Sequence, residues 1–187
     1  MTDQEPKAPK LPNFDYSPDI FRSAVLQIEK PIISLKLLSI ARADGFIEKP
    51  EYHITILPSE LFDRDSTSPE GMDKIDSLCK DLETICQSPI IEFAETLYMI
   101  SKPKIYEKDG EAVVEERQSI VISISPECDF AKRIFEIYRN WGYPEADLPF
   151  LHVTLFYKPD TDIARKGIGI ANLAEWESLK PQEINPL

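Results

Sequence analysis

The 187-residue chain contains only two histidines, and both occur in the same four-residue pattern. His53 begins the stretch His-Ile-Thr-Ile, and His152 begins the stretch His-Val-Thr-Leu 99 residues later. Each histidine is followed two positions on by a threonine, Thr55 in the first stretch and Thr154 in the second. Composition alone seldom places every histidine of a chain in one pattern, so the repetition indicates a functional site.

Alternation of polar and apolar residues is typical of a half-buried β-strand. Successive side chains of a strand point to opposite faces, so we expect His53 and Thr55 to share one face. His152 and Thr154 are expected to do the same on a second strand. Each strand would then bury its apolar residues and present an imidazole and a hydroxyl on the other face.

Two imidazoles and two hydroxyls are suited to phosphoryl transfer. An imidazole titrates near neutrality, so one ring can accept a proton from an attacking oxygen while the other donates a proton to the leaving oxygen. A hydroxyl beside each ring can donate to a non-bridging phosphoryl oxygen as negative charge builds there.

The paired motifs strongly resemble the signature of the 2H phosphoesterase superfamily, which carries two His-x-Thr/Ser motifs and includes LigT-type and other RNA 2′,3′-cyclic phosphodiesterases. The resemblance covers about residues 30–175. It implies a bilobal α+β fold, with two lobes related by an approximate twofold axis and a cleft that holds both motifs. It also implies that His53, Thr55, His152 and Thr154 form the catalytic quartet and that no metal or other cofactor is needed.

Aromatic residues near the second motif are candidates for substrate binding. Phe150 lies two residues before His152 and Phe156 four residues after it, so strict alternation predicts both on the pocket face, where they could stack on a base or ribose. Tyr157 has the opposite parity but flanks the motif, and we include it among the candidates.

Basic residues that could hold a phosphate are less clearly marked. Lys158, Arg165 and Lys166 form the densest basic group close to a motif. Arg117 precedes the apolar stretch Ser-Ile-Val-Ile-Ser-Ile and would suit the mouth of a cleft. A solvated surface position is the alternative for each of these side chains.

The elements that position the motifs read as α+β, with mainly antiparallel strands and helices packed outside them. We expect a short helical turn over 17–28 and helices over 68–88, 125–142 and 160–176. Besides the motif strands, we expect strands over 32–40 and 89–101, a strand that ends near Tyr106, and a strand over 112–124. Asp109-Gly110 predicts a hairpin turn. Residues 1–18 are expected to be a flexible tail, 19–180 a single bilobal domain, and 181–187 a short C-terminal tail.

Composition narrows the possible partners. The formal net charge is −12, which disfavours long nucleic acid and points to a small nucleotide or an RNA end as substrate. The three cysteines form no Cys-x-x-Cys pair, which fits a reducing compartment. The sequence has no signal peptide or membrane-spanning stretch, so we expect a cytoplasmic monomer that does not bind membranes.

Three functions remain open at this stage. The first is a metal-independent 2H phosphodiesterase that opens a 2′,3′-cyclic or related nucleotide phosphate. The second uses the same site for RNA-end repair or ligation, or for cleavage of 2′-5′ linked or cyclic oligonucleotides. The third is a non-catalytic module that binds nucleotides or RNA ends, although a binder has no need for two proton-transfer groups.

Overall fold

The computed structural model describes residues 12–16, 22–108, 111–158 and 168–184. Its elements in chain order are β1 Asn13–Tyr16, β2 Ala24–Ile28, α1 Leu35–Ala43, β3 Ile47–Glu48, β4 Tyr52–Leu57, α2 Ser59–Asp65, α3 Pro69–Cys86, β5 Phe93–Lys108, β6 Glu111–Ile124, α4 Asp129–Asn140, the 3₁₀ turn η1 Glu145–Asp147, β7 His152–Lys158, α5 Leu173–Ser178 and β8 Gln182–Ile184.

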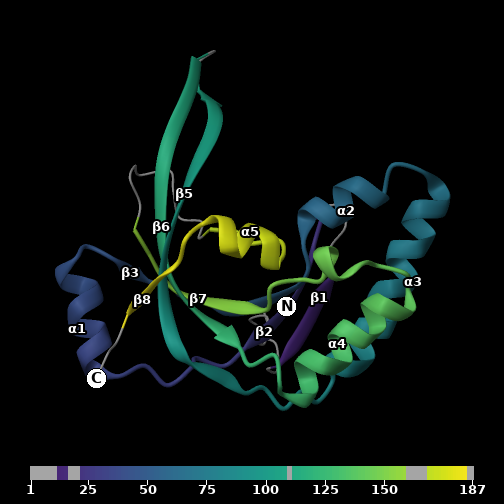
Figure 1. Cartoon of the computed structure of the whole chain (residues 1–187), viewed down its shortest axis with the longest axis horizontal. Helices are drawn as coiled ribbons and strands as arrows, with labels where there is room; N and C mark the ends of the chain where they lie inside the picture. The colour runs from purple at the N-terminus through teal and green to yellow at the C-terminus, as the bar shows by residue number, and fades with distance from the viewer. Residues whose placement is uncertain (1–11, 17–21, 109–110, 159–167, 185–187) are drawn as a thin grey trace, which may run out of the picture.

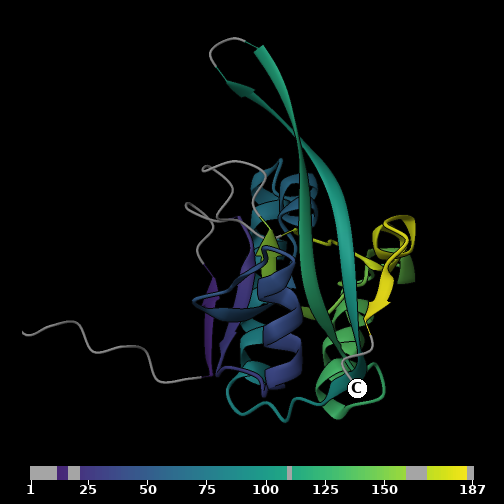
Figure 2. The ribbon, with the colours of Figure 1, turned by 90° about the vertical axis from the view of Figure 1, so that its left-hand side faces the viewer.

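The strands form one antiparallel sheet in the order β1-β2-β4-β7-β6-β5-β8, with the short β3 also paired to β7. Figure 2 shows this sheet across its width, from β1 on the left to β8 on the right. The predicted α+β class is confirmed. The prediction of two lobes related by a twofold axis is not confirmed, because the described strands belong to a single continuous sheet.

The sheet has one densely packed face and one face that is only partly covered. Helices α1 to α4 contribute buried side chains to the main core, together with β2, β4 and β7. Helix α5 lies on the other face, where Trp176 packs against Ile100 of β5 and Val121 of β6 (Figure 1). Among the described residues α5 covers the β5/β6 side, and the same face of β4, β2 and β1 borders an open cavity.

The two long helices follow the predicted periodicity. In α3 the Ser68 hydroxyl accepts a hydrogen bond from the Gly71 main-chain N–H at 3.1 Å, and Pro69 occupies the first helical position. Gly142 follows α4 with a φ of 81°, a left-handed conformation that glycine adopts at little cost. The helices predicted over 68–88 and 125–142 are therefore confirmed as α3 and α4.

Two predicted elements are wrong. The stretch 32–40, predicted as a strand, contributes most of α1 instead. The Ser34 hydroxyl caps that helix, and the buried residues Leu37 and Ala41 are four apart, which is the helical period. The stretch 17–28, predicted as a helix, ends in β2, where Ala24, Leu26 and Ile28 are buried alternately, as in a strand.

The chain ends also differ from the prediction. Residues 13–16, inside the expected flexible tail, form β1 and pair with β2. Gln182–Ile184, inside the expected C-terminal tail, form β8 and pair with β5. The helix predicted over 160–176 is limited in the described residues to α5, because the Asn172 side chain caps a helix that starts at Leu173. Residues 159–167 lie outside the described part of the chain.

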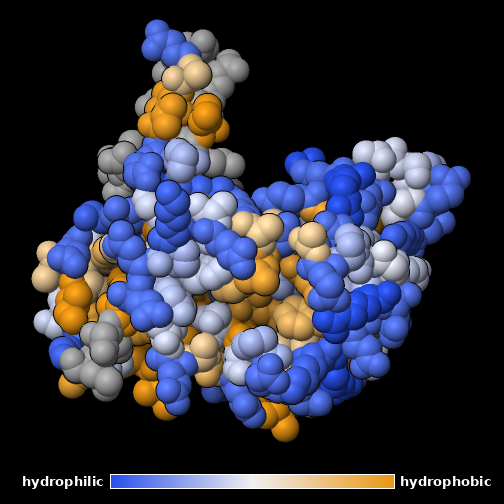
Figure 3. All heavy atoms as spheres, viewed as in Figure 1, coloured by the Kyte–Doolittle hydropathy of each residue, from blue (hydrophilic) through white to orange (hydrophobic). Residues whose placement is uncertain are grey.

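The β5/β6 hairpin extends beyond the rest of the sheet (Figures 1 and 2). Ile105 and Val114 face each other across it and are 67% and 64% exposed, within the hydrophobic group near its tip (Figure 3).

In the described residues no helix has both the length and the apolar composition needed to cross a membrane.

Candidate active site

The two motif strands, β4 and β7, are neighbours at the centre of the sheet. Ile54 pairs with Val153 in an antiparallel ladder, and both side chains are fully buried in the main core. The next residues in this register are His53 beside Thr154 and Thr55 beside His152. Directly opposed residues of an antiparallel pair share a face, so all four polar side chains lie on the face opposite Ile54 and Val153.

The register also makes the two histidines diagonal neighbours. Diagonal positions on adjacent antiparallel strands are about 7–8 Å apart, a separation at which two rings can flank one phosphorus. The motif strands are flanked by β2 and β6. On β2, Gln27 pairs with His53 and Val25 with Thr55. On β6, Ser123 pairs with His152 and Val121 with Thr154.

His152 is buried, with only 5% of its surface exposed. Its Nδ1 lies 2.8 Å from the Phe150 carbonyl oxygen, so Nδ1 carries the proton and donates it to that oxygen. The pKa of His152 is lowered to about 4, mainly by burial; the charge of His53 also lowers it, while the hydrogen bond to Phe150 and the charge of Glu175 act in the opposite direction. The ring is therefore neutral at pH 7, with Nε2 as a free base.

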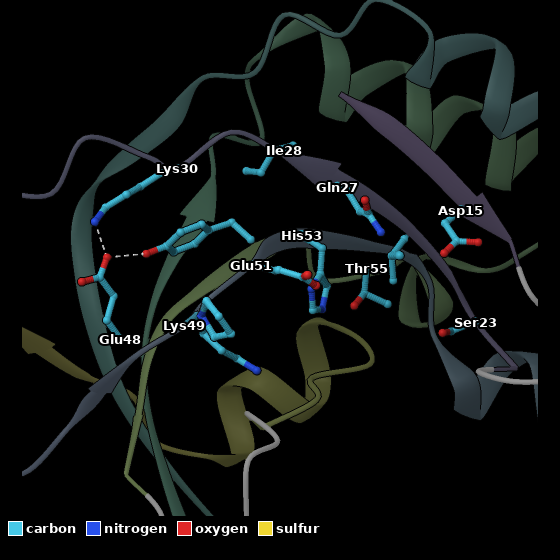
Figure 4. A pocket seen from close by; sticks show the side chains of 13 residues that line it. Asp15, Ser23, Gln27, Ile28, Lys30, Glu48, Lys49, Glu51, His53 and Thr55 are labelled. Atoms are coloured by element: carbon cyan, nitrogen blue, oxygen red, sulfur yellow. Dashed lines mark hydrogen bonds and ion pairs between the residues drawn. The ribbon is translucent and has the colours of Figure 1, made fainter. Parts of the chain in front are cut away.

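His53 stays exposed, but in a concave surface (Figure 4). The surrounding walls displace water from part of the ring, and this burial is the main cause of its lowered pKa. The charge of Lys49 lowers the pKa of His53 further, while the charge of Glu51 raises it. The two histidines thus differ: the His152 ring is buried and held by the Phe150 carbonyl oxygen, whereas the His53 ring is exposed to solvent.

Thr55 and Thr154 are both half-buried. Among the residues that the structure describes, neither threonine hydroxyl forms a side-chain hydrogen bond. In the β4/β7 register each threonine lies opposite the histidine of the other strand, as well as two residues from the histidine of its own motif. A phosphoryl group between the two rings would therefore meet one hydroxyl from each strand.

An open cavity of about 750 Å³ lies on this face and is bordered by β1, β2, β4 and the turn before β4. His53 and Thr55 line it, with Gln27 and Asp15 on the β1/β2 side. In Figure 4 these side chains point into the same open space. His152 and Thr154 do not line the cavity; they lie next to it on β7.

Phe150 supports His152. Its ring stacks on the imidazole, with centroids 5.5 Å apart and planes inclined by 26°, and stacks more closely on Trp176 at 4.3 Å and 15°. Trp176 in turn makes an edge contact with Tyr98. Phe150 was predicted on the pocket face, and the structure places it against the His152 ring rather than in the wall of the 750 Å³ cavity.

Phe156 does not lie on the site face, and that prediction is wrong. A β-bulge interrupts β7: Thr154 pairs with Val121 and Phe156 with Ile120, so Leu155 has no partner on β6. The extra residue shifts the alternation by one, which buries Phe156 completely in the main core. Tyr157 is thereby turned onto the face that holds the motifs, where it pairs with Ser119.

The two described basic candidates, Lys158 and Arg117, lie away from the four motif side chains. Lys158 has the opposite parity to Tyr157, and its ammonium lies 5.6 Å from the Phe46 ring centroid on the core side of the sheet. Arg117 shares the site face but is four residues along β6 from Val121, about 13 Å away. It donates to the carboxylate of Glu115, which is 1% exposed. Arg165 and Lys166 lie outside the described residues.

Lys49 is the cation that sequence reasoning missed. It lies in the turn between β3 and β4, lines the cavity with His53, and has its ammonium 5.4 Å from the Tyr157 ring centroid. Gln27 was also missed, although it is the β2 partner of His53. Neither belongs to a motif; a basic residue four positions before a strand histidine was the available signal for Lys49.

The described residues contain no group of three or more histidine, cysteine, aspartate or glutamate side chains arranged to hold a metal ion. Comparisons of the chain with protein-family models, with curated proteins and with solved structures found no match.

Proposed function

We propose that the protein is a 2H-type phosphodiesterase that hydrolyses a 2′,3′-cyclic or related RNA-end phosphate by general acid–base catalysis without a metal. The observation that carries this proposal is the β4/β7 register, which puts one histidine and one threonine of each strand on one face. The resemblance of the two motifs to the 2H phosphoesterase superfamily supports the same conclusion.

The different surroundings of the histidines suggest their roles. His152 is neutral, with Nε2 free, and acts as the general base that takes a proton from the attacking water. The water oxygen forms a bond to phosphorus as the bond to one ribose oxygen breaks. His53, protonated before the step, gives its proton to that ribose oxygen, and exchange with solvent afterwards restores both rings.

Thr55 and Thr154 donate hydrogen bonds to the non-bridging phosphoryl oxygens. Negative charge on these oxygens grows as the water attacks, so donors fixed in the sheet stabilise the transition state more than the ground state. Their position on rigid central strands keeps this geometry without a loop having to close.

The substrate we propose is a small nucleotide or an RNA end. The net charge of −12 disfavours long nucleic acid. The described cysteines, Cys79, Cys86 and Cys128, are buried free thiols, which supports a reducing cytoplasmic location. We propose that the protein acts there as a monomer.

Two alternative functions use the same residues. RNA-end repair or ligation, or cleavage of 2′-5′ linked or cyclic oligonucleotides, would need the same acid, base and hydroxyls. A nucleotide-binding module would use the cavity without turnover. The inequality of the two histidines, one buried and neutral and one exposed, favours catalysis, since a binder gains nothing from a neutral buried base.

The test is a turnover assay of the purified protein in EDTA with 2′,3′-cyclic mononucleotides, 2′-5′ linked oligonucleotides and RNA ends. Hydrolysis of a 2′,3′-cyclic phosphate that disappears in His53→Ala would support the proposal. Turnover confined to oligonucleotides would favour the first alternative. Binding of nucleotides without turnover of any phosphodiester would favour the binding module.

A further inference from the structure

Lys49 is held at the edge of the motif strands by its main chain. Its N–H donates a hydrogen bond to the Leu155 carbonyl oxygen at 2.9 Å, directly at the bulge in β7. Its side chain then extends into the cavity that His53 lines, beside the ring of Tyr157. In Figure 4 His53 lies between Lys49 and Thr55.

The ammonium of Lys49 has no ion-pair partner among the described residues, as no carboxylate of theirs lies within 4.0 Å. This is notable because acidic residues outnumber basic ones 33 to 21 in the sequence. Other cations near this face are paired: Lys30 with Glu48, and Lys102 with Glu175.

Leaving a half-buried ammonium unpaired has a cost in free energy. Burial lowers the pKa of Lys49, and only the more distant charge of Glu51 acts in the opposite direction. An anionic ligand in the cavity would remove this cost by supplying the missing partner.

We propose that Lys49 binds a phosphate oxygen of the substrate next to His53, so that the site selects anions through this lysine rather than through Lys158 or Arg117. This inference rests on the proposed function for its substrate class, a nucleotide phosphate. The Tyr157 ring holds the ammonium in position by a cation–π contact. A local cation of this kind lets an acidic protein attract a small anion without binding polyanions.

The test compares Lys49→Met with Lys158→Met. Both variants remove one positive charge, but Lys158 lies on the core side of the sheet, so it controls for the change in net charge. The probes are inorganic phosphate and adenosine 2′-monophosphate, titrated by calorimetry. We expect Lys49→Met to weaken binding of both at least 10-fold, Lys158→Met to change it less than twofold, and Lys49→Arg to restore most of the affinity.

A second readout uses the fact that the chain has only two imidazoles, which NMR can follow individually. The charged groups near His53 are Lys49, Glu51, Asp15 across the cavity and His152 on β7. Removing the Lys49 charge should raise the pKa of His53, and Lys158→Met should leave it unchanged. This measurement is independent of turnover.

The outcomes separate this inference from the proposed function. If the wild-type protein binds adenosine 2′-monophosphate through Lys49 but hydrolyses no phosphodiester, the proposed function fails and the anion site stands. If the protein hydrolyses a diester but Lys49→Met and Lys158→Met behave alike, the inference is overturned. Failure of the wild-type protein to bind either probe would also overturn it.

Discussion

The Nδ1 of His152 lies 2.8 Å from the carbonyl oxygen of Phe150, two residues earlier in the chain. This bond sets the tautomer of the ring and directs the lone pair of Nε2 away from the main chain. The second histidine, His53, has no such bond to a described residue. The two copies of one motif therefore place chemically unequal imidazoles on adjacent strands.

Replacing either histidine should abolish most of the activity. His53→Ala and His152→Ala should each lower kcat about 10²–10⁴-fold, as loss of one acid–base group does. The double variant should lose less than the product of these factors, because the two groups act together. Steady-state kinetics on a 2′,3′-cyclic nucleotide measures this, and near-full activity in either single variant would refute the assigned roles.

The same substitutions should differ in their effect on stability. His53 is exposed, so His53→Ala should change the free energy of unfolding by less than about 0.5 kcal/mol. His152→Ala removes a buried hydrogen bond and a ring stacked on Phe150, and should cost about 1–3 kcal/mol. Urea unfolding of both variants checks this; equal losses would contradict the different burial of the two rings.

The pH dependence of activity should be a bell on the acid side of neutrality. His152 must be neutral to act as a base, which requires a pH above its pKa of about 4. His53 must be protonated to act as an acid, and its pKa is lowered from 6.5. The profile of kcat/KM should therefore peak between these two values. A maximum above pH 7 would reverse or exclude these roles.

His152 should also make stability depend on pH. Its pKa in the folded protein, about 4, is below the ordinary value of 6.5, so between these pH values the unfolded chain binds a proton that the folded chain does not. The free energy of unfolding should consequently fall as the pH drops from 6.5 to 4, by up to about 3 kcal/mol. His152→Gln should lose this component, and denaturant unfolding at several pH values compares the two proteins.

Neighbouring aromatic residues test the bulge in β7. Phe156→Ala should lower the free energy of unfolding by about 3–5 kcal/mol, because it empties a core position. Tyr157→Ala should cost far less stability but should weaken substrate binding, since Tyr157 faces the site. Unfolding curves and KM values for the two variants show which residue faces the core. A larger loss of stability in Tyr157→Ala than in Phe156→Ala would mean that β7 has no bulge.

Chelation should leave activity intact. The proposed steps use only protein side chains and water, so turnover in excess EDTA should equal turnover in buffer without EDTA. Loss of activity in EDTA, with recovery on adding one specific divalent ion, would point to a metal-dependent mechanism.

The quartet could be predicted because it depends on local information. A strand has a period of two, so the pattern His-x-Thr by itself places each histidine with its threonine. The partnership of β4 with β7, which joins the two motifs, is a contact between distant parts of the chain. The resemblance to the 2H phosphoesterase superfamily predicted that the two motifs share one site, whereas the local sequence pattern did not.

The failures have identifiable physical causes. The stretch 32–40 is rich in isoleucine and reads as a strand, yet the Ser34 cap and the burial of Leu37 and Ala41 favour a helix. The prediction for Phe156 was wrong because a single unpaired residue, Leu155, reverses the alternation of side chains along β7. No residue type in β7 indicates this bulge. Lys49 was missed because its location depends on the tertiary position of a turn.

The pairing of Ile54 with Val153 has a consequence for how the protein acquires activity. This contact closes a loop of about 100 residues, which is slow to form and entropically costly compared with a local hairpin such as β5/β6. The two histidines, the acid and the base of the proposed mechanism, therefore come together late in folding, on strands synthesised far apart in time. Under the proposed function, a nascent or partly folded chain carries the two motifs apart and cannot hydrolyse substrate until β4 and β7 have paired.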